Sequence, residues 1–176
     1  MHAASDIRQR PIGGSLGLFF AGLWSVLGAL ALQKPMQAPA MAVGLLLSAV
    51  LILRLWRLPN RADGGTAMFR RRAYAVAVVL EIAALYGVAL LLPRYGLRSY
   101  FIPAVGVVVG LHFVGLWKAA GHARFLWIAA GMTALSLLSM AIPAAPLLVA
   151  ANLRDAVCAY GNAVVLWCFA GQRLTA

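Results

Sequence analysis

Six runs of mostly apolar residues, each close to the length of a membrane-spanning helix, dominate this chain. A helix needs about 20 such residues to cross about 30 Å of hydrocarbon. The runs cover residues 12–32, 40–56, 73–92, 100–117, 125–142 and 147–169. They predict an all-α polytopic integral membrane protein, a bundle of six transmembrane helices, in which residues 1–176 form a single transmembrane domain.

The composition agrees with this prediction. Of the 176 residues, 64% are hydrophobic and 11% are charged, whereas soluble domains carry about 25% charged residues. A soluble chain of this size has too few polar side chains to cover such an apolar surplus, which argues against a typical soluble enzyme and a disordered tail. Two cysteines are too few for a disulfide scaffold.

Prolines mark several of the breaks between the runs. Pro35 follows the first run, and Pro39 precedes the second at a position where a missing backbone N–H costs little. Pro143 and Pro146 separate the fifth run from the sixth. They make one continuous helix implausible, and a re-entrant hairpin is the alternative to two full spans at this point.

The first run also has features of a secretory signal peptide. Basic residues precede it, and Ala29 and Ala31 form an A-x-A pattern near its end. Its apolar stretch of about 20 residues is longer than the usual 7–15 residues of a signal peptide. We therefore expect it to be retained as the first span.

The basic residues are distributed unevenly between the two sides of the predicted bundle. One side holds the N-terminus, the second and fourth loops and the C-terminus, with eleven basic residues: Arg8, Arg10, Arg54, Arg57, Arg61, Arg70, Arg71, Arg72, Lys118, Arg124 and Arg173. The other side holds three, namely Lys34, Arg94 and Arg98. Because basic loops stay inside, this bias predicts N- and C-termini in the cytoplasm. The net charge of +11 thus reflects topology, and we expect no nucleic acid partner.

Small residues recur at helical spacing within the runs, as expected where helices pack closely in lipid. Ala21, Ser25 and Gly28 belong to such a series in the first run, and Gly106 and Gly110 form a G-x-x-x-G pattern in the fourth. We expect these residues to pack helices within one chain. A homo-oligomer, or a separate membrane partner besides the lipid bilayer, is the alternative.

Ionisable and amide side chains inside the apolar runs are the candidate site. Charged groups near the bilayer centre are costly and usually mark a pathway or a binding site. The candidates for binding a substrate or ion are Glu81, Arg154, Asp155, His112, Asn152 and Asn162. With one histidine inside a run, the three or four ligands of a metal site are missing, and we expect no metal and no cofactor.

The estimated depths of these groups suggest how they pair. Arg154 and Asp155 are adjacent in sequence and point about 100° apart on a helix, so each needs a partner from another helix. We expect Arg154 to pair with Glu81 near the membrane centre. Asp155 is then left to His112, to a nearby asparagine or to water. This pairing would give one polar spot formed by the third, fourth and sixth runs.

Two carboxylates beside one arginine favour transport or binding of a small solute, ion or proton, since such groups serve as proton relays in membranes. The alternatives are an intramembrane enzyme that acts on a lipid or isoprenoid by carboxylate and histidine acid–base chemistry, and a non-catalytic subunit of a larger complex. A mere packing clamp is the structural interpretation of the same residues. The short loops favour a bacterial inner membrane as the location, and a small hydrophobic or ionic ligand is expected.

Overall fold

A computed structural model of the chain describes residues 12–57, 72–147 and 150–175. These ranges contain six α-helices and one short 3-10 helix, and no strand. The elements are α1 (Ile12–Leu30), α2 (Lys34–Arg57), α4 (Arg72–Arg94), η1 (Arg98–Tyr100), α5 (Phe101–Ala120), α6 (Arg124–Met140) and α7 (Leu153–Thr175). The predicted all-α bundle of six helices is thereby confirmed.

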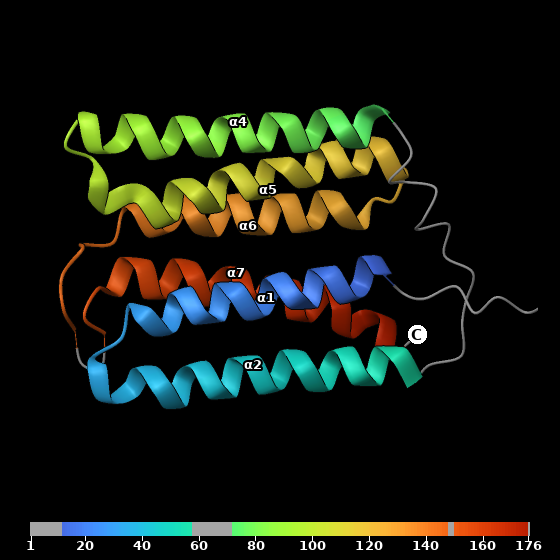
Figure 1. Cartoon of the computed structure of the whole chain (residues 1–176), viewed down its shortest axis with the longest axis horizontal. Helices are drawn as coiled ribbons and strands as arrows, with labels where there is room; N and C mark the ends of the chain where they lie inside the picture. Colours follow the sequence, from blue (N-terminus) through green and yellow to red (C-terminus); the bar gives the residue numbers. More distant parts are fainter. Residues whose placement is uncertain (1–11, 58–71, 148–149, 176) are drawn as a thin grey trace, which may run out of the picture.

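The helices form an open row whose members alternate in direction (Figure 1). Along this row α4 packs on α5, α5 on α6, α6 on α7, α7 on α1 and α1 on α2. The start of α1 and the end of α7 lie at the same end of the bundle (Figure 1). We call this the basic end, because it carries Arg54, Arg57, Arg72, Lys118 and Arg124. The opposite end is called the far end.

Four of the helices are long and apolar enough to cross a membrane, and they cover Gly13–Leu30, Lys34–Arg57, Arg72–Arg94 and Arg98–Ala120. The apolar helix α6 is shorter, with 17 residues. α2 begins at Lys34, before the expected start at residue 40, and it contains Pro39. Its first turn tolerates Pro35 because the first backbone N–H groups of a helix have no partner within the helix.

The last helix begins later than expected. α7 starts at Leu153, six residues after the predicted start of the sixth span at residue 147. The chain between α6 and α7 instead folds back onto the end of α1, where the backbone N–H groups of Ala151 and Asn152 both donate to the carbonyl oxygen of Ala31. The first residues of α7 therefore lie at the far end of the bundle (Figure 1).

Small side chains allow the helices to approach closely, as the sequence indicates. Ala21 and Ser25 of α1 are fully buried, and Ser25 lies against Gly44 of α2. Both glycines of the G-x-x-x-G pattern face α6: Gly106 lies beside Ser136, and Gly110 lies beside Thr133. This pattern therefore packs helices within one chain.

The contact at Gly106 predicts a stability difference between two glycine substitutions. A Cβ atom at Gly106 would overlap Oγ of Ser136, whereas one at Gly87 of α4 meets no atom within 4 Å. We expect Gly106→Ala to destabilise the bundle by about 1–3 kcal/mol, the usual cost of overpacking. Gly87→Ala is the matched control and should leave stability unchanged or slightly raised. Thermal unfolding in detergent measures both, and equal melting temperatures would contradict the packing described.

Candidate functional site

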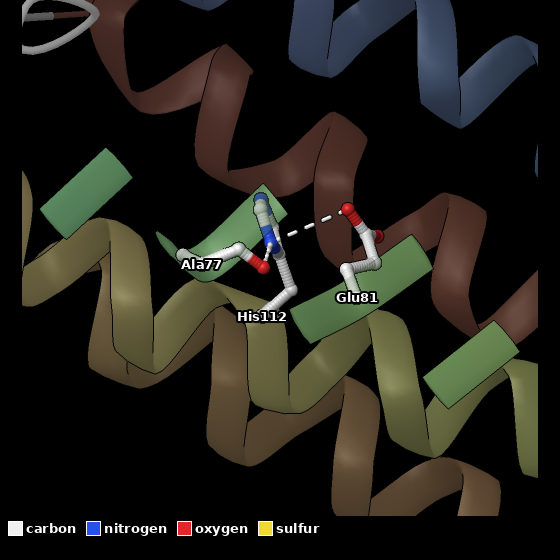
Figure 2. Close-up of polar contacts among 3 residues, drawn as sticks. All are labelled: Ala77, Glu81 and His112. Carbon is white, nitrogen blue, oxygen red and sulfur yellow. Dashed lines mark hydrogen bonds and ion pairs between the residues drawn. The ribbon is translucent and has the colours of Figure 1, made fainter. Parts of the chain in front are cut away.

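Glu81 of α4 and His112 of α5 form the ion pair found among the described residues. Nδ1 of His112 lies 3.3 Å from Oε2 of Glu81 and 3.3 Å from the carbonyl oxygen of Ala77, one turn earlier on α4 (Figure 2). The Glu81 side chain is 20% exposed and the His112 side chain is 11% exposed. Both residues lie well inside their helices, about 12–14 Å from the basic end at 1.5 Å per residue. The pair is therefore held near the middle of the bundle.

The two oxygens around Nδ1 determine which ring nitrogen of His112 carries a proton. A carbonyl oxygen can only accept a hydrogen bond, so Nδ1 must donate to Ala77 and Glu81. Neither contact uses Nε2. The imidazole is thus oriented by its Nδ1–H group, and Nε2 is the position at which a proton can bind or leave.

A groove runs between α4 and α5 beside this pair. It has a volume of about 440 Å³ and is open on one side. The residues that line it are Ala73, Val76, Ala77, Leu80, Glu81, Ala84, Val108, Leu111, His112, Val114, Gly115 and Lys118. Apolar walls with a few polar groups are typical of a small-molecule site, for which volumes of about 300–1,000 Å³ are usual.

The position of α4 at the edge of the row explains why this groove exists. α4 packs against α5 and η1 and leaves most of its surface exposed. The two helices lie very close together where Gly115 of α5 meets Ala77 of α4. A Cβ atom at Gly115 would overlap the Ala77 side chain. This close approach brings the Ala77 carbonyl within reach of His112, which lies one turn before Gly115.

Arg154 does not pair with Glu81, and the predicted pairing is wrong. Its side chain is 6% exposed; Nε donates to the carbonyl oxygen of Ile142 at 2.7 Å and Nη1 donates to that of Ser99 at 3.3 Å. The guanidinium also lies 4.1 Å from the ring centre of Tyr100. Because α7 starts at Leu153, Arg154 is at the far end, and helical side chains tilt toward the N-terminus of their helix, away from the centre.

Asn152 and Asp155 together cap the N-terminus of α7. The Asp155 backbone N–H donates to Oδ1 of Asn152 at 3.3 Å, and Nδ2 of Asn152 donates to Oδ2 of Asp155 at 2.7 Å. The first bond is the usual N-cap contact, from the backbone N–H three positions later to the side-chain oxygen of the capping residue. The second bond joins the two side chains, because the Asn152 backbone N–H donates to Ala31. The spacing Asn-x-x-Asp was the sequence signal for this cap, and an early helix start at residue 147 concealed it.

Asn162 belongs to a third polar group, buried between α6 and α7. Its Nδ2 donates to Oγ of Ser136 at 3.1 Å, and Sγ of Cys158 lies 3.6 Å from the same hydroxyl. The Asn162 side chain is fully buried. The expected single polar spot is thus divided among three places: the groove, with Glu81 and His112; the far end, with Arg154, Asn152 and Asp155; and the contact between α6 and α7, with Asn162. Of the six candidates only Glu81 and His112 line the groove. Lys118, which also lines it, was interpreted from the sequence as a topology signal alone.

The described ranges also bear on metal binding. Within them, no three His, Cys, Asp or Glu side chains come together in a group that could hold an ion. The carboxylate and imidazole in the groove supply two ligands, and a protein metal site ordinarily uses three or four.

The contacts of Arg154 predict a structural role that is independent of the groove. Arg154→Gln removes hydrogen bonds from a charged donor to two carbonyl oxygens, and we expect a loss of about 2–3 kcal/mol in the free energy of unfolding. Arg94→Gln, at an exposed position of the same end, should change stability by less than about 0.5 kcal/mol. Chemical unfolding in detergent compares the two variants. Equal stability of both would show that the Arg154 contacts contribute nothing.

Comparison with profiles of known protein families, with curated proteins and with solved structures finds no match to this chain. Its function has to be inferred from the chemistry of the groove side chains.

Proposed function

We propose that this membrane protein binds a small solute, ion or proton in the groove between α4 and α5 and moves it across the membrane. The observation that carries the proposal is the Glu81–His112 pair, which lines a groove of about 440 Å³ near the middle of the bundle. Ionisable groups at such a depth are costly and commonly belong to proton relays. The short connections between helices and the charges at the basic end support a bacterial inner membrane with that end facing the cytoplasm.

His112 is the group that exchanges the proton in this proposal. An imidazole ring has two nitrogens and can carry a proton on one of them or on both. A proton that arrives through the groove binds at Nε2 and converts the ring to imidazolium, while Nδ1–H keeps its contacts with Ala77 and Glu81. The Glu81 carboxylate offsets the new positive charge. Loss of the proton from Nε2 restores the neutral ring, so the cycle needs no other reactant.

The lining of the groove favours binding and transport over enzymatic chemistry. Among the described residues that line it, none carries a hydroxyl or thiol group that could act as a nucleophile. The hydroxyl and thiol groups of Ser136 and Cys158 lie between α6 and α7 instead. A base without a nearby hydroxyl or thiol group fits proton exchange better than covalent catalysis of the serine or cysteine type.

Proton movement in liposomes tests this role with a matched pair of variants. The protein is reconstituted around a pH-sensitive dye, a pH gradient is applied, and the rate of internal acidification is measured with the membrane potential clamped. Glu81→Gln removes the carboxylate that accepts from Nδ1–H of His112, and we expect the protein-dependent rate to fall at least about tenfold, the effect of losing one charged hydrogen bond. Asp155→Asn makes the same chemical change outside the groove and should keep most of the rate.

Any of the following results would contradict the proposal. One is a wild-type rate no greater than that of protein-free liposomes. The other is a Glu81→Gln rate equal to that of the wild type, or an equal fall in both variants.

A further inference from the structure

The groove has an outer part at Lys118 and an inner part beside Glu81 and His112. Its lining extends along α4 from Ala73 to Ala84 and along α5 from Val108 to Lys118. At 1.5 Å per residue this length is about 15 Å. Half of a hydrocarbon core of about 30 Å has the same depth. The groove therefore runs from the basic end, at Lys118, to the Glu81–His112 pair near the centre, and its length matches one leaflet.

The charges are arranged unequally along this length. At the basic end the groove has Lys118 of α5, and Arg72 directly precedes the lining residue Ala73 of α4. The acidic residues within the described ranges are Glu81 and Asp155; the first is paired with His112 and the second caps α7 at the far end. Among the described residues, the end of the groove at Lys118 is thus positive, and an anion is the ligand group that this charge attracts.

Between the two ends the walls are apolar. Val76 and Leu80 of α4 and Leu111 and Val114 of α5 line this part of the groove. Burial of an apolar chain against such walls is favourable by about 25 cal/mol per Å². The volume of about 440 Å³ is that of a site for one small ligand.

We propose that the solute is an organic anion with a single apolar chain, whose carboxylate, sulfonate or phosphate headgroup binds at Lys118 and whose chain lies along the groove toward Glu81 and His112. This inference rests on the proposed function of the groove, since it names the class of solute bound there. The lysine ammonium supplies the charged hydrogen bond to the headgroup, and the apolar walls hold the chain.

Binding of two oppositely charged probes tests the inference. The protein is placed in nanodiscs of phosphatidylcholine, and calorimetry measures the binding of octanesulfonate and of octyltrimethylammonium, with empty nanodiscs subtracted. We expect octanesulfonate to bind at one site at least about tenfold more tightly than the cation. A charged hydrogen bond contributes about 1.5–3 kcal/mol, so Lys118→Gln should weaken octanesulfonate binding about tenfold or more.

Two control variants separate the groove from the general charge of the surface. Lys34→Gln changes a lysine at the far end, and Arg57→Gln removes a positive charge from the basic end on α2, at the opposite edge of the row from α4. Neither residue lines the groove, and both variants should bind octanesulfonate within about twofold of wild type. Equal affinity for the two probes, or an equal loss in all three variants, would overturn the inference.

A further arm distinguishes a free organic anion from a phospholipid headgroup. If phosphatidylglycerol in the nanodiscs abolishes octanesulfonate binding, the occupant is the lipid and the inference is wrong. The proposed function is tested separately by the Glu81-dependent proton rate. A normal proton rate without anion preference overturns the solute class alone, whereas Lys118-dependent binding with no effect of Glu81 overturns proton transport and leaves the anion site.

Discussion

The absence of water from the hydrocarbon core is the constraint on which this structure depends. Each polar group there must find its partner within the protein, since an unsatisfied group costs several kcal/mol. The backbone meets this demand by forming helices, and several polar side chains find partners at three places in the bundle. Glu81 pairs with His112, Arg154 donates to two carbonyl oxygens, and Asn162 donates to Ser136. The candidate site is the one of these groups that borders a groove.

The groups differ in how their polar atoms are used in contacts with the protein. Arg154 and Asn162 are buried, and their contacts connect segments that are distant in sequence. His112 uses Nδ1 for its contacts with Ala77 and Glu81, and these contacts do not involve Nε2. A side chain whose orientation is fixed by one atom while another exchanges protons is suited to a functional role. This distinction sets the Glu81–His112 pair apart from the packing contacts of Arg154 and Asn162, and it is the reason that we propose a role for the pair.

The position of α4 at the edge of the row is equally important for the site. A helix in the middle of the row has neighbours on both sides that fill the space around it. Among the described helices α4 packs mainly against α5, with η1 at one end, and the crevice beside Glu81 stays open. Gly115 brings the helices together beside Ala77. The groove and the hydrogen bond to His112 thus have the same origin in one close helix crossing.

The sequence by itself determined the class of fold and the chemistry available inside it. Apolar runs of about 20 residues specify helices because the length and polarity of a helix are local properties. The choice of partners was decided only by the tertiary structure. Which charged side chains pair depends on where each helix starts and on which helices are neighbours. Because α7 starts at Leu153, Arg154 lies at the far end, away from Glu81. Glu81 pairs with His112 instead because α4 and α5 are adjacent in the bundle. Lys118 lines the same groove.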